Sequence, residues 1–188
     1  ITELEKQGKA SDFVMGFEES YGYLAGTHAR DKDAVVASML ICEMAAYYKS
    51  QGKTLIDVMN SLYDEFGYYC NTVQSYTFEG AAGMEKMAAI MDGLRDNKPS
   101  SFAGYEVTKI DDYKTSKSTI VKTGEESKIT LPKSNVLAYT LTNGNKVIVR
   151  PSGTEPKIKA YITAIGQSEE NAKEIAQRLL DDANELMK

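Results

Sequence analysis

Residues 136–166, VLAYTLTNGNKVIVRPSGTEPKIKAYITAIG, decide the fold of the second half of the chain. Asn143-Gly144 separates two apolar runs, and this dipeptide is typical of a tight β-hairpin turn. The run after residue 156 alternates between apolar and other side chains, with its apolar positions at Ile158, Ala160, Ile162 and Ala164. Because alternation of period two indicates a half-buried strand, we expect three strands here. The last two strands hold residues 150–156 between them.

The segment between those two strands, Arg150-Pro151-Ser152-Gly153-Thr154-Glu155-Pro156, has the composition of an anion-binding loop. Arg150 offers a planar fork of N–H donors that fits a phosphoryl group, and Ser152 and Thr154 add hydroxyl groups. Gly153 lets the backbone approach a ligand closely, and the prolines stiffen both ends of the loop. The spacing differs from the GxxxxGK[ST] pattern of nucleotide-binding loops, so the segment indicates a small phosphorylated metabolite.

A second polar motif lies far upstream, at Gly16-Phe17-Glu18-Glu19-Ser20-Tyr21-Gly22. Its two adjacent carboxylates and its hydroxyl group accept hydrogen bonds from vicinal hydroxyls of a ligand. The glycine at each end allows the backbone to curl around a sugar ring. This loop therefore suits a polyhydroxyl ligand, and it complements the anion-binding loop downstream.

In this order, GFEESYG and RPSGTEPKIK closely resemble the sugar-binding and phosphate-binding loops of the α-D-phosphohexomutases, of the phosphoglucomutase/phosphomannomutase type. The resemblance covers nearly the whole chain. It implies a phosphoryl shift between the C1 and C6 oxygens of a hexose phosphate, through a bisphosphate intermediate and a phosphoserine. It also implies that sugar hydroxyls contact Glu18, Glu19 and Ser20, and that the nontransferring phosphate contacts Arg150, Ser152, Gly153 and Thr154.

Two further residues follow the first motif. By resemblance, Lys32 belongs to a Lys-Asp pair whose lysine lies near the reacting phosphate, where it would transfer a proton or stabilise charge. Ala34 stands where the family often has glycine. His28 is the one histidine of the chain, and we interpret it as an exposed loop residue.

The family's phosphoserine loop, a Thr-Ala-Ser-His-Asn-Pro-like string, and its Asp-Gly-Asp-type magnesium loop do not occur in the sequence. We therefore expect the C-terminal part of a longer enzyme, in which residues 1–70 end a third, sugar-binding domain and residues 71–188 form the fourth, phosphate-binding domain. By resemblance, Mg²⁺ is held outside this chain, no metal ligand lies within it, and glucose 1,6-bisphosphate is the intermediate or activator. The expected partners are a hexose phosphate and the upstream domains, and the isolated chain should be inactive.

Helical periodicity predicts further elements on both sides of this boundary. We expect a helix over residues 33–51 that is buried on most sides, and a second helix that begins at a Thr54/Asp57 capping box. Residues 80–96 and 168–187 read as amphipathic helices, whereas the polar stretch 111–133 reads as a solvated excursion. The expected class is α+β, namely the mainly helical end of an α/β domain and a small α+β domain with an antiparallel sheet and helices packed on one face.

The charge balance excludes a nucleic-acid surface in the first part of the chain. The 188 residues carry a formal net charge of −5, and the whole excess lies in residues 1–70. Phosphate backbones need a basic footprint, so the local cations that attract an anion are Arg150, Lys157 and Lys159. No apolar run is long enough to span a membrane, and we expect a cytoplasmic protein without nucleic-acid or membrane partners.

The activity that the resemblance implies is that of a phosphoglucomutase, which interconverts glucose 1-phosphate and glucose 6-phosphate. A phosphomannomutase or phosphopentomutase of the same family is one alternative. A noncatalytic module that binds phosphosugars is another.

Overall fold

The computed structural model describes residues 1–18, 21–80 and 82–187, and its backbone contacts divide the chain into two compact units, Ile1–Leu62 and Tyr63–Lys188. The boundary expected between residues 70 and 71 lies within strand β3 (Tyr68–Thr77), which pairs along its length with a strand of the second unit.

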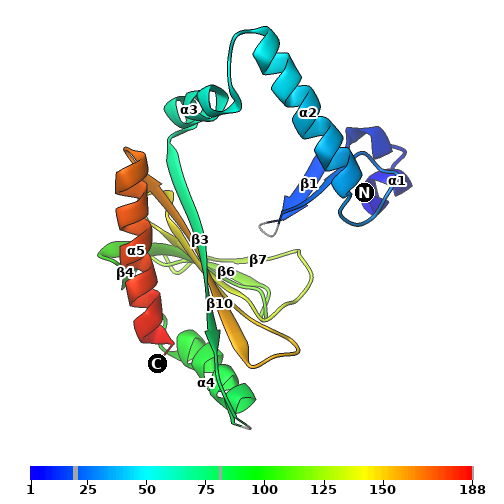
Figure 1. The fold of residues 1–188 in the computed structure, drawn as a ribbon. Helices are drawn as coiled ribbons and strands as arrows, with labels where there is room; N and C mark the ends of the chain where they lie inside the picture. The colour runs from blue at the N-terminus through cyan, green and yellow to red at the C-terminus, as the bar shows by residue number, and fades with distance from the viewer. Residues whose placement is uncertain (19–20, 81, 188) are drawn as a thin grey trace. The chain divides into compact units, whose positions relative to one another are not determined.

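The first unit combines a small hairpin with helices (Figure 1). It begins with α1 (Thr2–Lys6) and the short helix η1 (Ala10–Asp12), followed by the antiparallel pair β1 (Met15–Glu18) and β2 (Gly22–Ala25). Helix α2 (Ala34–Ser50) begins after Asp33, whose Oδ1 accepts hydrogen bonds from the backbone N–H groups of Val35 and Val36. An N-cap of this kind satisfies donors that have no partner within the helix.

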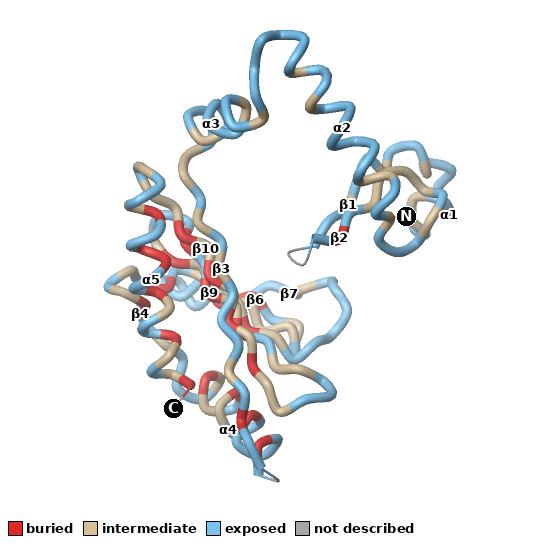
Figure 2. The backbone as a smooth tube through the Cα atoms, viewed as in Figure 1, coloured by how far each residue is buried: buried red, intermediate tan, exposed pale blue. Residues whose placement is uncertain are grey.

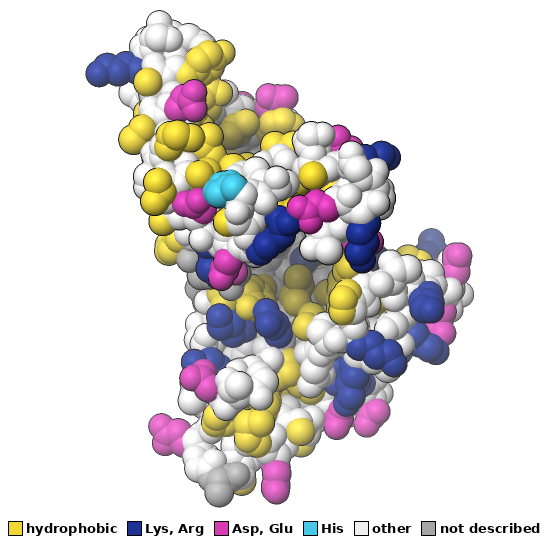
Figure 3. All heavy atoms as spheres, turned by 90° about the vertical axis from the view of Figure 1, so that its right-hand side faces the viewer, with side chains coloured by type: hydrophobic (Ala, Val, Ile, Leu, Met, Phe, Trp, Pro, Cys, Tyr) yellow, Lys and Arg dark blue, Asp and Glu magenta, His cyan; other side chains and the backbone are white. Residues whose placement is uncertain are grey.

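The expectation that α2 is buried on most sides is wrong. None of its residues is buried, and Val35 and Tyr47 are 79% and 60% exposed. Apolar residues of α2 lie on all sides of the helix. Its contact with β2 covers only some of them. Hydrophobic side chains accordingly lie on the surface of the molecule (Figure 3).

Helix α3 (Leu55–Phe66) begins as the sequence predicts. The backbone N–H of Thr54 donates to Asp57 Oδ2 over 2.8 Å, and the N–H of Asp57 donates to Thr54 Oγ1 over 3.1 Å. These reciprocal hydrogen bonds form a capping box and confirm the predicted helix start.

The second unit is built on an antiparallel sheet with the strand order β3-β10-β9-β8-β5-β6-β7. A short strand, β4 (Ser101–Phe102), pairs with β5 beside this path. The other strands are β5 (Tyr105–Asp112), β6 (Lys117–Ile120), β7 (Glu126–Lys128), β8 (Leu137–Leu141), β9 (Lys146–Pro151) and β10 (Lys157–Gly166). Together with the helices below, this sheet confirms the predicted α+β class.

The core of the second unit lies on one face of the sheet. The four apolar residues that alternate along β10 are all at most 1% exposed: Ile158, Ala160, Ile162 and Ala164. Helices α4 (Gly83–Asp96) and α5 (Glu169–Leu186) pack against β10 (Figures 1 and 2). Helix α5 buries the residues that its periodicity predicts, Ala172, Ile175, Ala176, Leu179 and Ala183.

The turn between β8 and β9 confirms the hairpin predicted at Asn143-Gly144. Both residues have positive φ angles, 66° and 79°, which asparagine and glycine tolerate better than other residues. The next residue, Asn145, is fully buried, and its Oδ1 accepts a hydrogen bond from the N–H of Ile165 over 2.8 Å. This bond ties the start of β9 to the end of β10.

The polar stretch 111–133 is not simply a solvated excursion. It contains β6 and β7, which extend the sheet beyond β5, and Ser118 on β6 is buried. The free backbone groups on the edge of β5 explain this difference, because they form ladder hydrogen bonds with a neighbouring strand whatever its side chains are.

Helix α5 provides a test of the core. Leu179 is fully buried, so Leu179→Ala should lower the free energy of unfolding of the second unit by about 2–5 kcal/mol through a cavity in the core. Leu131→Ala is the matched control, because Leu131 is 60% exposed and its loss should change stability by less than about 0.5 kcal/mol. Urea denaturation followed by circular dichroism measures both values, and equal losses would contradict the assigned core.

Candidate functional site

The 150–156 loop joins the ends of two paired strands. Its closing hydrogen bond runs from the backbone N–H of Ser152 to the carbonyl of Lys157 over 2.7 Å. Ser152 Oγ accepts hydrogen bonds from the N–H groups of Thr154 and Glu155, over 3.3 and 3.2 Å. Because the oxygen of Ser152 already accepts these two bonds, its hydroxyl proton is directed to a further acceptor. Among the described residues, the N–H of Gly153 has no hydrogen-bond partner, so it is also available to an anion.

Two cations lie side by side next to this loop. Arg150 on β9 is directly opposite Lys159 on β10, and both project from the face of the sheet that faces away from the core, because their neighbours Val149 and Ile158 are buried. Like charges directly opposite each other destabilise a sheet. Within the described part of the chain, neither residue forms an ion pair, whereas Lys157 pairs with Glu155 over 3.0 Å. The Arg150/Lys159 pair is therefore suited to an anion from outside the fold.

In the first unit, Glu18 at the end of β1 lies close to Lys32, which precedes α2. Lys32 Nζ lies 3.5 Å from Glu18 Oε1 and 2.8 Å from Asp31 Oδ1. The hydrogen bond to Asp31, followed by the negative charges of Asp31 and Glu18, raises the pKa of Lys32. Lys32 therefore stays protonated and carries a positive charge. The other two predicted residues of this loop, Glu19 and Ser20, lie outside the described residues.

The start of α2 anchors this arrangement. The N–H of Asp33 donates to the carbonyl of Tyr23 on β2 over 2.7 Å, and His28 Nε2 donates to Asp33 Oδ2 over 2.8 Å. His28 is partly exposed, as the sequence predicts, but it also restrains the N-cap residue that follows Lys32. The hydrogen bond from His28, with those from the backbone of Val36 and Val35, lowers the pKa of Asp33.

Tyr21 is a candidate that the sequence analysis missed. Its φ angle is 63°, in the left-handed region that bulky residues rarely adopt, and it is 88% exposed. Strained conformations of this kind are concentrated at functional sites. An aromatic residue inside a polar, glycine-bounded motif was the available signal, because such a ring stacks readily on the apolar face of a sugar.

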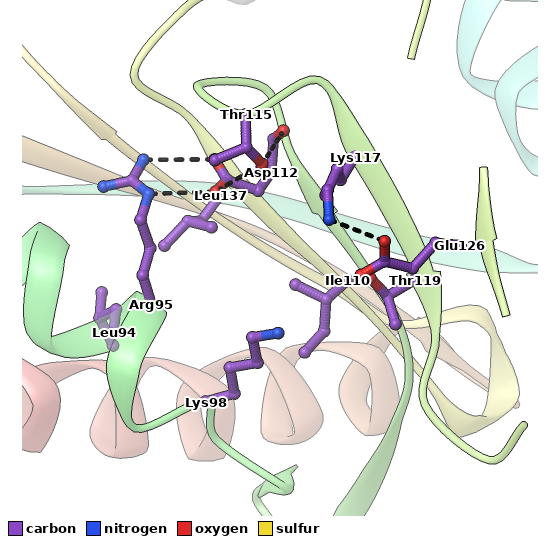
Figure 4. A pocket seen from close by; sticks show the side chains of 10 residues that line it. All are labelled: Leu94, Arg95, Lys98, Ile110, Asp112, Thr115, Lys117, Thr119, Glu126 and Leu137. Atoms are coloured by element: carbon purple, nitrogen blue, oxygen red, sulfur yellow. Dashed lines mark hydrogen bonds and ion pairs between the residues drawn. The ribbon is translucent and has the colours of Figure 1, made fainter. Parts of the chain in front are cut away.

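A cavity of about 240 Å³ lies at the other end of the sheet, between the end of α4 and strands β5–β7 (Figure 4). Arg95 bonds Asp112 over 3.2 Å and Asn135 over 2.6 Å, and Lys117 pairs with Glu126 over 2.8 Å. Burial raises the pKa of Asp112, but hydrogen bonds from Arg95 and Thr115 outweigh this effect and leave it lowered. These charges neutralise one another, so we assign them to the junction between α4 and the sheet.

Comparison with known proteins agrees with this division into two parts. The family model for α/β/α domain III of phosphoglucomutase/phosphomannomutase matches residues 2–66, and the model for the C-terminal domain of the same family matches residues 84–182. The chain belongs to the phosphoglucomutase/phosphomannomutase family. The resemblance noted in the two sequence motifs is thereby confirmed.

Curated members of the family are similar over most of this chain. A phosphoglucomutase of Staphylococcus haemolyticus is 40% identical over 151 residues, which are 80% of this chain and 27% of that protein. A phosphoglucomutase of Staphylococcus saprophyticus is 35% identical over 178 residues, 95% of this chain and 32% of the relative. The chain thus spans roughly a third of the length of these relatives.

The fold is also similar to a solved member of the family. The crystal structure of the open form of pp63/parafusin, a phosphoglucomutase from Paramecium, superposes with a TM-score of 0.65. The match covers 99% of this chain and 31% of that chain at 17% identity. At this level of identity the comparison bears on the fold alone.

The described residues offer no site for the metal that this family implies. In residues 1–18, 21–80 and 82–187, no group of three or more His, Cys, Asp or Glu side chains is placed to hold a metal ion. The same residues contain no helix that is both long and apolar enough to cross a bilayer.

The Asp33 cap predicts a dependence on pH at the start of α2. The folded-state pKa of Asp33 is lowered from 3.8, so the cap stabilises α2 above about pH 3.8 and is lost as the pH falls through the folded-state pKa. An NMR titration should show the amide signals of Val35 and Val36 moving with a midpoint below 3.8. Asp33→Asn keeps a capping oxygen but should remove this titration, and a wild-type midpoint above 3.8 would contradict the assignment.

Proposed function

We propose that this chain supplies the sugar-binding and phosphate-binding loops of a phosphoglucomutase that interconverts glucose 1-phosphate and glucose 6-phosphate through a bisphosphate intermediate. The observation that carries the proposal is the two adjacent cations Arg150 and Lys159, which form no ion pair with any described residue and lie beside the hydroxyl group of Ser152 and the N–H of Gly153. Relatives named phosphoglucomutase support glucose as the sugar. In this proposal residues 1–70 belong to the third domain of the enzyme and residues 71–188 form the fourth.

The second unit binds the phosphate that is not transferred. Arg150 forks onto two of its oxygens, Lys159 adds a second positive charge, and Ser152, Gly153 and Thr154 contribute hydroxyl and backbone donors. The strands on either side of the loop keep these donors in place before the ligand arrives. Binding of an anion also offsets the repulsion between Arg150 and Lys159. This repulsion therefore destabilises the sheet only while the site is empty.

The first unit binds the sugar. Glu18 and Glu19 accept hydrogen bonds from ring hydroxyls, and Ser20 accepts or donates one. Lys32 places a positive charge near the reacting phosphate. Because the pKa of Lys32 is raised, it stays charged and serves as an electrostatic stabiliser of the negative charge on that phosphate rather than as a base.

The phosphoserine and the Mg²⁺ ligands of the proposed enzyme belong to upstream domains of the same polypeptide. Mg²⁺ would supply electrostatic stabilisation of the transferring phosphoryl group there. Glucose 1,6-bisphosphate would be the intermediate, and the enzyme would act in the cytoplasm. Assays of the complete protein on glucose, mannose and pentose phosphates test the sugar assignment, because a clear preference for mannose or pentose phosphate would refute it.

Arg150 gives the sharpest test of phosphate binding. Arg150→Ala should weaken binding of glucose 6-phosphate to this chain by about 1.5–3 kcal/mol, roughly tenfold to hundredfold, because a charge-assisted bidentate contact is lost. Arg150→Lys should restore only part of the affinity, because an ammonium group lacks the planar fork. An NMR titration measures this through the amide signals of Ser152, Gly153 and Thr154.

Lys146→Ala is the matched control for that titration, because Lys146 lies on the same strand and the same face but at the other end. It should leave the affinity within about twofold of the wild type. If wild type and Arg150→Ala titrate alike, the assignment of the phosphate site is wrong.

Glu18 tests the sugar loop. In the complete enzyme, Glu18→Ala should lower kcat/KM for glucose 1-phosphate. The loss of transition-state stabilisation should be about 0.5–1.5 kcal/mol, and up to roughly 3 kcal/mol where the carboxylate charge contributes. Glu18 lies at the exposed end of β1, so the melting temperature should change little. An unchanged kcat/KM with a lowered melting temperature would show that Glu18 is structural.

A further inference from the structure

The end of the 16–22 hairpin shows an unusually close approach between a side chain and a glycine. Gly22 is buried although it belongs to a small exposed hairpin, and the aliphatic stem of Lys32 passes over it. A Cβ atom at position 22 would lie 2.6 Å from Lys32 Cγ, closer still to Lys32 Cδ, and 2.7 Å from Glu18 Oε1. Carbon atoms in favourable contact are about 3.5–4.0 Å apart, so no side chain fits here while Lys32 keeps its position.

The backbone does not require glycine at this position. The φ angle of Gly22 is outside the positive range, and Gly22 pairs with Glu18 in the regular antiparallel register. An alanine would be compatible with this strand conformation. Glycine is therefore required at position 22 because there is no space above the strand for a side chain. The sequence alone indicates a different reason, namely that glycine lets the backbone curl around a ligand.

We propose that Gly22 is a positioning residue, which makes the room through which Lys32 crosses the hairpin to reach Glu18. This inference rests on the proposed function, in which Lys32 and Glu18 act on the phosphate and on the sugar. The absence of a Cβ atom at position 22 thus allows both Lys32 and Glu18 to take their positions. The Lys32 ammonium lies between Asp31 and Glu18 because its stem lies flat against Gly22.

Alanine at position 22 should disturb the site without unfolding the protein. The atoms that it meets belong to flexible side chains, so Lys32 and Glu18 move away while the hairpin keeps its hydrogen bonds. Gly16 on β1 provides a matched control in the same hairpin. A Cβ atom there would have its nearest neighbour, Phe13 Cζ, at 3.7 Å, an ordinary contact distance.

The experiment compares Gly22→Ala with Gly16→Ala in the complete enzyme. We expect kcat/KM for glucose 1-phosphate to fall about tenfold or more in Gly22→Ala and by clearly less in Gly16→Ala, with similar melting temperatures for both. A double-mutant cycle with Lys32→Ala isolates the cause. In the Lys32→Ala background, Gly22→Ala should have a much smaller effect than in the wild type, because the stem is absent and only the contact with Glu18 Oε1 remains. An additive loss overturns the inference, and so does a large fall in the melting temperature of Gly22→Ala.

A second readout does not depend on activity. The Lys32 side-chain signals in an NMR spectrum of this chain should shift in Gly22→Ala and remain unchanged in Gly16→Ala. An unchanged Lys32 signal in Gly22→Ala overturns the inference. Failure of the proposed function is distinguishable, because it would appear in the wild type as a lack of turnover of glucose 1-phosphate while the Lys32 signals still decide the role of Gly22.

Discussion

The pairing of β10 with both β3 and β9 is the constraint on which the second unit depends. Its inward side chains form the floor of the core beneath α5, and its outward side chains include Lys159. A slip of one residue would turn the buried row outward and bring lysines into the core, so burial determines the register strictly. That register also places Lys159 opposite Arg150. The core therefore determines the position of the cations beside the 150–156 loop.

The charged side chains of the two candidate loops are arranged differently. In the second unit, Arg150 and Lys159 repel each other across the strands, a local cost that natural proteins accept mainly at functional sites. In the first unit, Lys32 is held between the carboxylates of Asp31 and Glu18. In the proposed function, an anion relieves the repulsion between Arg150 and Lys159, and the acidic 16–22 loop offers acceptors to the hydroxyl groups of the sugar.

The Arg95 cluster shows how the same types of residue serve the structure instead. Arg95 is largely buried, and it bonds Asp112, Asn135 and the carbonyl of Met91. The guanidinium group of Arg95 therefore bonds within the fold, and Lys117 across the cavity pairs with Glu126. The contrast with Arg150 lies in the partners and not in the residue type. A count of cations along the sequence cannot make this distinction.

The sequence by itself determined the features that depend on residues a few positions apart. These are the hairpin at Asn143-Gly144, the alternation along β10, the buried stripe of α5, the capping box of α3 and the two motifs that identify the family. Only the tertiary structure decided the features that depend on distant neighbours. It left α2 exposed, drew the polar stretch after residue 111 into the sheet, and placed Arg150 beside Lys159 and Lys32 over Gly22. The physical reason is that burial, charge pairing and free space are properties of the surroundings of a residue, which the folded chain creates.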